Sequence, residues 1–145
     1  MPFLFHAIMH PFDNSDQTVR VRVIHDDTIF HTLKIPFDKF VNFDGNCHDA
    51  ACTVETKTRF DNNGLPYYTT DYSSDDAAFI HVTHKVSEDF FRVRFVSNDS
   101  LIWALKMSYE EFDLFNDSCH DAGMTFDTDL KFGVEGIPVY ITTIR

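Results

Sequence analysis

One stretch of this chain occurs twice, and this repeat constrains the fold more than any other feature of the sequence. Arg20-Val21-Arg22 recurs 72 residues later as Arg92-Val93-Arg94, and the same shift holds without a gap for more than forty residues. Within it, Cys47-His48-Asp49-Ala50 recurs as Cys119-His120-Asp121-Ala122. The sequence therefore predicts a tandem duplication.

The repeat divides the chain into two copies, residues 1–72 and residues 73–145. A unit of about 70 residues buries too little surface to be stable alone, so we expect the copies to share a core or pack tightly. The 145 residues match the usual size of one domain, and the 16 phenylalanines supply a large area for burial. We expect one compact, pseudo-symmetric domain.

The first copy is predicted to contain five strands and one helix. Val19 to Val23 alternates apolar and polar residues with the period of a half-buried strand. Phe37, Phe40, Phe43 and Cys47 fall on one face of a helix that Pro36 can begin. The predicted strands span residues 3–10, 19–23, 28–35, 53–60 and 67–70, the helix spans 37–50, and a polar joint covers 71–76.

The second copy repeats this order, and its helix carries a clearer start signal. Ser108 followed by Glu111 forms the sequence pattern of a capping box. The predicted strands span residues 78–84, 90–97, 100–107, 125–132 and 138–143, and the helix spans 109–122. Short connections favour antiparallel pairing, so we predict an α+β fold made of two β-β-β-α-β-β units related by a pseudo-two-fold axis. One continuous sheet and two separate sheets both fit this pattern.

The formal charge of −11 bounds the kinds of partner. Binding through phosphate contacts needs an excess of Lys and Arg, so the composition argues against direct nucleic-acid binding and against anionic membranes. The first copy has ten acidic and six basic residues, and the second has thirteen and six. Most of the negative charge therefore belongs to the second copy.

Cysteine usage and the N-terminus bear on localisation. Three cysteines are an odd number without the dense spacing of a disulfide scaffold, which favours a reducing compartment. The first residues have no positive segment followed by a long apolar core, and no run approaches about eighteen apolar residues. We expect a soluble, cytoplasmic protein.

The repeated Cys-His-Asp triplet contains the residue types of a thiol nucleophile, a base and an orienting acid. Neighbouring residues on a helix point about 100° apart, so a cysteine cannot pair with the histidine beside it. Only contacts between copies, Cys47 with His120 or Cys119 with His48, would make such a pair. We interpret both cysteines as small buried apolar residues and predict no catalytic residue.

The histidines do not predict a metal site, and we expect no cofactor. His6 and His10 share a strand face but lie about 13 Å apart, too far to hold one ion. Duplicated phosphoesterases of the two-histidine class place a His-x-Thr on a strand of each half. Here His81-Val82-Thr83 matches that pattern, whereas the first copy has His6-Ala7-Ile8 without the hydroxyl. The sequence therefore does not favour this class.

The two Arg-x-Arg pairs, Arg20 with Arg22 and Arg92 with Arg94, are the clustered bases. They lie on the wet face of their predicted strands, where we expect them to pair with cross-strand acids.

Carboxylates crowd the second helix and its surroundings. Where that copy has Glu111, Asp113 and Asp129, the first copy has Lys39, Val41 and Lys57. Two interpretations stay open: a solvated face that keeps the protein soluble, or a negative surface that steers toward a basic partner. The candidate binding residues are Glu110, Glu111, Asp113, Asp117, Asp121, Asp127, Asp129, Asp75 and Asp76.

We therefore expect a small acidic, non-catalytic binding protein that docks on a basic or nucleic-acid-binding protein and inhibits or modulates it. One form of this hypothesis is a nucleic-acid mimic encoded by a virus or a mobile element. An enzyme with a site at the junction of the copies, built from the Cys-His pairs, is the first alternative. A structural protein that forms homodimers or other symmetric oligomers through exposed strand edges is the second.

Overall fold

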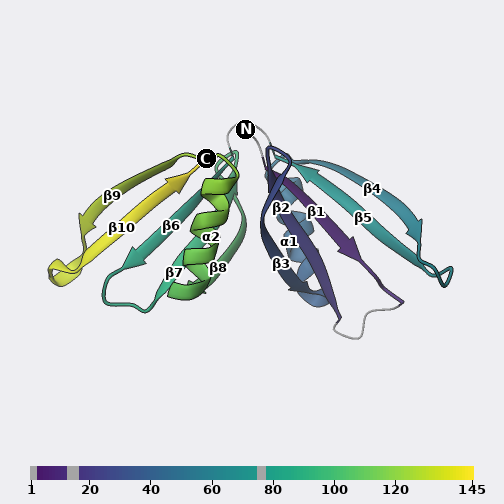
Figure 1. Ribbon diagram of the computed structural model, residues 1–145, viewed down its shortest axis with the longest axis horizontal. Helices are drawn as coiled ribbons and strands as arrows, with labels where there is room; N and C mark the ends of the chain where they lie inside the picture. Colours follow the sequence, from purple (N-terminus) through teal and green to yellow (C-terminus); the bar gives the residue numbers. More distant parts are fainter. Residues whose placement is uncertain (1–2, 13–16, 75–77) are drawn as a thin grey trace.

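Ten strands form two separate five-stranded antiparallel sheets in the computed structural model, which describes residues 3–12, 17–74 and 78–145 (Figure 1). The first sheet has the strand order β3-β2-β1-β5-β4. Its strands are β1 (Leu4–Met9), β2 (Thr18–His25), β3 (Thr28–Pro36), β4 (Thr53–Phe60) and β5 (Pro66–Ser73).

The second sheet has the corresponding order, β8-β7-β6-β10-β9. The predicted α+β class, the antiparallel pairing and the single helix per half are confirmed. The strands of this sheet are β6 (Phe79–Lys85), β7 (Phe90–Ser97), β8 (Ser100–Ser108), β9 (Phe126–Phe132) and β10 (Pro138–Ile144), and a short 3-10 helix, Val134–Gly136, joins the last two.

The two helices, α1 (Phe37–Asp49) and α2 (Tyr109–Asp121), follow the third strand of each half. The capping box predicted for α2 is confirmed: the Glu111 backbone N–H donates to the Ser108 hydroxyl at 3.2 Å, and the Ser108 N–H donates to the Glu111 carboxylate at 3.1 Å. In contrast, α1 begins after Pro36 without a side-chain cap. The two helices thus begin by different chemistry at matching places.

The last strand of the first half is longer than the sequence predicted. β5 continues to Ser73, whereas we expected it to end at residue 70 and to give way to a polar joint over 71–76. Tyr72 explains the difference, because it pairs with Phe5, is 1 % exposed, and donates a hydrogen bond to Asp44 at 2.6 Å. A ring that is buried in this way holds its polar neighbours in the strand.

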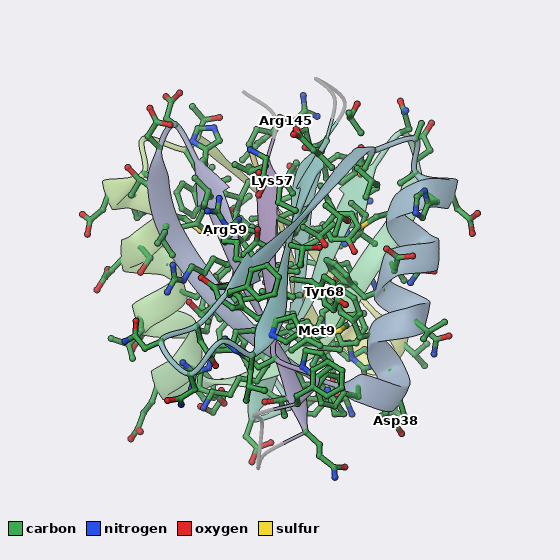
Figure 2. All side chains as sticks on the ribbon, turned by 90° about the vertical axis from the view of Figure 1, so that its right-hand side faces the viewer. Met9, Asp38, Lys57, Arg59, Tyr68 and Arg145 are labelled. Carbon is green, nitrogen blue, oxygen red and sulfur yellow. The ribbon has the colours of Figure 1, made fainter. Side chains whose placement is uncertain are left out.

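One hydrophobic cluster contains residues of both halves. Each helix packs on the core-facing side of its own sheet and also against the other half, α1 against β8 and α2 against β3. The ring centroids of Phe5 and Phe95 lie 6.0 Å apart, and those of Phe30 and Phe115 lie 6.1 Å apart. Viewed onto the first sheet, the helices lie on opposite sides of the molecule (Figure 2).

The strands place most of the basic side chains on the outer faces of the two sheets. Side chains alternate between the two faces of a strand, so residues next to Val19, Val21, Val82 or Val93 in the core point to the outer face of their sheet. This alternation places ten of the twelve Lys and Arg residues on the outer faces. They are Arg20, Arg22, Lys34, Lys57 and Arg59 on the first sheet, and Lys85, Arg92, Arg94, Lys106 and Lys131 on the second.

Candidate functional site

A groove of about 210 Å³ runs between helix α2 of the second half and strand β3 of the first half. It exists because α2 packs against both sheets and leaves one side of the helix beside β3 uncovered. The residues that line the groove are Phe30, His31, Glu111, Leu114, Phe115 and Ser118.

The floor of this groove, which we call the α2–β3 groove, is aromatic. Phe115 is buried, and its ring lies 6.1 Å from that of Phe30 and 5.2 Å from that of His31. Leu114 stands beside them and is 71 % exposed. An exposed leucine next to an aromatic floor gives an apolar contact area that a partner side chain can cover.

Acidic residues form a stripe along α2 beside the groove. Glu110, Asp113, Asp117 and Asp121 recur at intervals of three or four residues, so they occupy an arc of about 80° on the helix surface. All four are exposed. The helix contains no Lys or Arg, and none of the ion pairs formed within the described residues involves an acid of α2. The acidic stripe therefore carries uncompensated negative charge.

The β2–β3 turn adds to this charge at the C-terminal end of the helix. A ring nitrogen of the buried His25 lies 3.0 Å from the backbone carbonyl oxygen of Ala122, which follows α2. The contact places the β2–β3 turn, with the exposed Asp26 and Asp27, beside the C-terminal end of α2. The negative surface thus extends from the helix onto the other half of the molecule.

His31 is the titratable group of the groove floor. Burial lowers the pKa of His31 below its ordinary value, and the neighbouring Glu111 carboxylate offsets part of that effect. The neutral imidazole is therefore favoured at neutral pH, and the Glu111 carboxylate, which accepts the Ser108 N–H, keeps its negative charge beside it.

The matching place between α1 and β8, which we call the α1–β8 groove, has different side chains. Under the 72-residue shift, Trp103 corresponds to His31, Asn42 to Leu114 and Asn46 to Ser118. The Trp103 ring packs 5.9 Å from that of Phe43, and the Asn46 amide donates to the Ile102 carbonyl at 3.0 Å. In the α1–β8 groove, the larger Trp103 ring and the Asn46 hydrogen bond thus take the places of His31 and Ser118.

The nine acids that the sequence singled out do not form one patch. The five on α2 lie together, but Asp127 and Asp129 lie on β9 and face the other way. The Phe126 ring stacks on His120 of α2 at 4.0 Å, so the alternate residues of β9 point to the outer face of the sheet. Asp75 and Asp76 lie outside the described residues.

The Cys-His pairs do not assemble a nucleophile. Cys47 and Cys119 are fully buried, whereas His48 is 57 % exposed and lies 3.5 Å from Asp44, and His120 stacks on Phe126. The hydrogen bond with Cys52, and then burial, raise the pKa of Cys47, and burial raises the pKa of Cys119 to about 12. A nucleophilic thiol needs the opposite shift, so this geometry argues against a thiol enzyme.

Neither histidine of the strand motifs belongs to a shared site. His6 lies on the outer face of the first sheet, 2.6 Å from the Asp71 carboxylate, and His81 lies on the outer face of the second. Because the inner faces of both sheets pack on one core, these outer faces point away from each other. Over the ranges described, no group of three or more His, Cys, Asp or Glu is placed to hold a metal ion.

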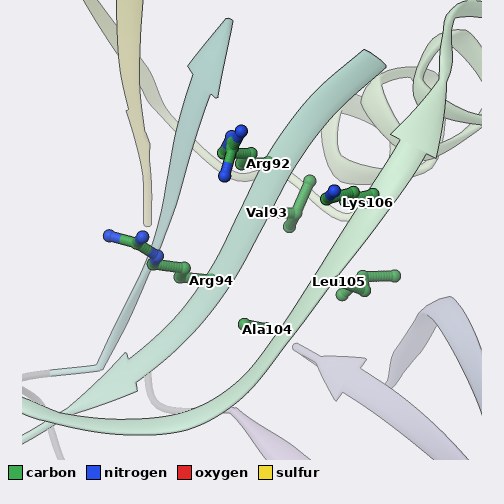
Figure 3. Close-up of a pocket in the computed structure, with 6 residues that line it drawn as sticks. All are labelled: Arg92, Val93, Arg94, Ala104, Leu105 and Lys106. Carbon is green, nitrogen blue, oxygen red and sulfur yellow. The ribbon is translucent and has the colours of Figure 1, made fainter.

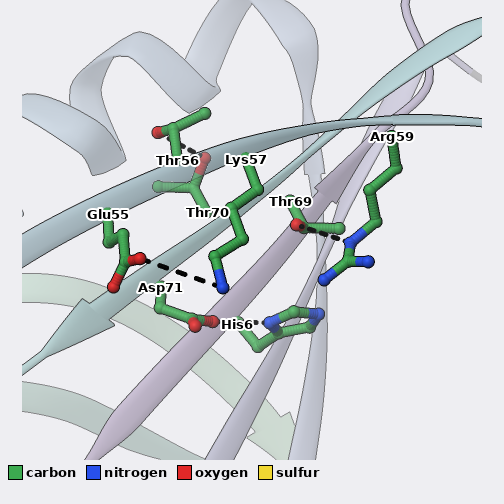
Figure 4. A network of polar contacts seen from close by, with 8 residues as sticks. All are labelled: His6, Glu55, Thr56, Lys57, Arg59, Thr69, Thr70 and Asp71. Atoms are coloured by element: carbon green, nitrogen blue, oxygen red, sulfur yellow. Dashed lines mark hydrogen bonds and ion pairs between the residues drawn. The ribbon is translucent and has the colours of Figure 1, made fainter.

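The prediction that the paired arginines face cross-strand acids is wrong, and the acid that Arg92 pairs with, Glu88 at 3.3 Å, lies in the turn before its own strand. Arg20 and Arg22 lie opposite Lys34 and Thr32, and Arg94 lies opposite Ala104. The strand acids instead contact other groups, as Figure 4 shows for the first sheet, where Glu55 lies 3.9 Å from Lys57. Register decides these partners, and the sequence pattern alone does not fix register.

Comparison with protein-family models, curated proteins and solved structures finds no match for this chain. None of the described helices is long and apolar enough to cross a membrane.

The acids of α2 form a visible cluster in the sequence, but the residues that line the groove beside them do not. Phe30, His31, Leu114 and Ser118 come from segments more than 80 residues apart, and only the packing of α2 on β3 joins them. A signal was present: positions 31, 114 and 118 differ in character from positions 103, 42 and 46 of the repeat.

Proposed function

We propose that this chain is a non-catalytic binding protein whose docking surface is the α2–β3 groove with its acidic stripe. The occupant is a basic amphipathic segment of another protein, with apolar side chains on Leu114 and the aromatic floor and Lys or Arg side chains against the stripe. A nucleic-acid-binding protein is one such partner, and the carboxylates then stand where its phosphates would. Occupying that surface inhibits or modulates the partner.

The observation that carries the proposal is the coincidence of an open apolar groove with uncompensated acids on one helix. An acidic helix face alone is consistent with solubility. Here the acids border an exposed leucine and an aromatic floor, which a purely solvating surface does not require. Interfaces combine an apolar centre with a charged rim, and charge complementarity selects the partner.

The position of the acids along α2 supports the proposal. The C-terminal end of a helix carries partial negative charge, so Asp117, whose counterpart on α1 is Gly45, lowers the stability of α2. Side chains that lower the stability of a fold are often kept where they contribute to binding.

We further propose that the two halves arose by tandem duplication and then diverged at the helices. The matching strand orders and helix positions agree with this origin. On this proposal, the α1–β8 groove keeps a structural role, and the α2–β3 groove acquired the docking role.

The test uses a synthetic helical peptide with leucines on one face and lysines on the other, measured by fluorescence anisotropy. Charge reversal of Asp113 and Asp117 to Lys should weaken binding at least about tenfold, because several close charge pairs become repulsive. The control reverses Asp38 and Asp49, which lie exposed on α1, and changes the net charge by the same amount.

The proposal predicts that the α1 variant retains affinity within about threefold of the wild type and that affinity falls with added salt. Equal losses for the two variants would show attraction by overall charge and not by a site. Binding that does not change with either variant would also contradict the proposal. Capture of natural partners from a lysate then uses the wild type, the α2 variant and the α1 variant.

A further inference from the structure

A second recess lies on the outer face of the second sheet, away from the α2–β3 groove. It has a volume of about 190 Å³ and lies over β7 and β8 (Figure 3). Two cationic side chains come from β7, and one comes from β8. The lining residues are Arg92, Val93, Arg94, Ala104, Leu105 and Lys106.

Register brings these cations together. Arg92 lies directly opposite Lys106, and the next pair on the same face is Arg94 with the small Ala104. Val93 is buried, which places Arg92 and Arg94 on the same, outer face of β7. Like charges directly opposite each other destabilise a sheet, so a bound anion would reduce the repulsion between Arg92 and Lys106.

Two of the three cations are held in place by neighbouring groups. The Arg92 guanidinium lies 3.3 Å from the Glu88 carboxylate and 5.2 Å from the centre of the Phe90 ring. The Lys106 ammonium lies 4.7 Å from the centre of the same ring. The aromatic ring thus fixes two positive groups on opposite strands. Cations held in advance lose less side-chain entropy when they bind a ligand.

Arg94 has a different environment. Its cross-strand neighbours are Ala104 on one side and His81 on the other, and no ion pair within the described part of the chain uses its guanidinium. Burial, and then the positive charge of Arg94, lower the pKa of His81. A neutral imidazole beside Arg94 can donate or accept a hydrogen bond without adding charge.

We propose that this recess binds a phosphate-type oxyanion through Arg92, Arg94 and Lys106. Guanidinium groups present paired N–H donors that match the oxygens of a phosphate, and lysine adds a point charge. The site is local: the protein as a whole is strongly negative and repels long polyanions, so a compact phosphate group is the expected ligand.

The matching place on the first sheet provides a control. Arg20, Arg22 and Lys34 repeat the three cations, but Thr32 replaces Ala104 and Thr18 replaces Phe90. There, His6 lies between Arg22 and the carboxylate of Asp71, whereas the residue that pairs with His81 at the corresponding position is the neutral Thr143. Both sheets thus have a carboxylate near the cations, Asp71 on the first and Glu88 on the second, and the difference is the Phe90 ring, which the first sheet lacks.

The experiment is a titration with pyrophosphate, followed by backbone amide shifts in NMR spectra. Arg94→Gln and Lys106→Gln should each raise the dissociation constant at least about tenfold, because each removes a charge-assisted hydrogen bond to the ligand. Arg22→Gln and Lys34→Gln, with the same charge changes on the first sheet, should keep it within about twofold.

A second titration, with a short single-stranded oligonucleotide, distinguishes a free phosphate from a polynucleotide backbone. Binding of either ligand that Arg94→Gln weakens and Arg22→Gln leaves intact supports the site and identifies the source of the phosphate. No binding of either ligand at millimolar concentration would overturn the proposal. Equal weakening by the variants of both sheets would overturn it too, because the effect would then follow overall charge.

Discussion

The two helix–strand grooves have the same backbone arrangement and opposite surfaces. In the α1–β8 groove, Trp103 packs on Phe43 and Asn46 bonds the strand that the helix crosses. In the α2–β3 groove, His31 and Ser118 occupy those positions, and Leu114 remains exposed. A few side chains thus set which contacts the protein makes within each groove.

The two helices also differ in how their acidic side chains are used. On α1, Asp44 accepts a hydrogen bond from Tyr72 and lies within ion-pair distance of His48, so its charge serves internal contacts. On α2, the corresponding residue is Asn116, and the acids lie in the exposed stripe. On our proposal, the first half stabilises the molecule and the second half presents the binding surface.

The largest predicted difference between the grooves is the loss of unfolding free energy when Trp103 or His31 is replaced by alanine. Trp103→Ala should lower the free energy of unfolding by about 3 kcal/mol, since it removes a large ring that packs in the core layer. His31→Ala should cost only about 1 kcal/mol, the value of one aromatic edge contact. Urea unfolding of both variants measures this. Equal costs would contradict the contrast between a filled and an open groove.

The buried thiols predict a dependence of stability on alkaline pH. The pKa of Cys119 in the folded protein, about 12, is above the unfolded value of about 8.5, so its contribution is complete below pH 8.5 and is lost as pH rises toward 12. The loss should be on the order of 2 kcal/mol by pH 10.

Cys119→Ala tests this contribution. Cys119 is the simpler of the two buried thiols, because its counterpart Cys47 has a hydrogen bond with Cys52, and Met124 stands at the matching place in the second half. The stability of the variant should fall less steeply between pH 8 and pH 10 in denaturant unfolding. Parallel curves for the variant and the wild type would show that Cys119 does not contribute.

The Tyr72–Asp44 hydrogen bond belongs to the first half alone, since Ile144 and Asn116 stand at the matching positions. Tyr72→Phe should cost about 1.5 kcal/mol, because a hydrogen bond to a carboxylate is stronger than a neutral one. A double-mutant cycle with Asp44→Asn isolates the pair. Additive effects would show that the two residues act independently.

The smallest predicted effect concerns the dipole of α2. Asp117→Asn should raise the free energy of unfolding by about 0.5 kcal/mol, since it removes a negative charge near the C-terminal end of the helix. Asp38→Asn, in the first turn of α1, should lower it by a similar amount. Thermal unfolding at low salt measures both, and changes of the same sign would refute the dipole argument.

Much of this fold follows from the sequence, because local periodicity and turn chemistry agree along the chain. The alternation around Val21 and the capping box of Ser108 and Glu111 each identify an element that the structure contains. The exception is instructive: the polar residues around Tyr72 suggested a joint, and the burial of its ring extends the strand.

The candidate site follows from the sequence only in part. The acids of α2 are visible as a cluster along one helix, but the groove beside them depends on which strand that helix meets. His31 and Leu114 come together through contact between the halves, and periodicity carries no information on such contacts. The same holds for the outer sheet faces, where register sets Arg92 against Lys106 in a chain of negative net charge.

The most direct test of the docking role is the NMR footprint of the basic amphipathic peptide on the wild-type protein. We predict that amide shifts change along α2 and β3, strongest around Leu114 and His31, while α1 and β8 stay unchanged. Equal changes in both grooves, or changes confined to α1 and β8, would contradict the proposal that the second half presents the binding surface.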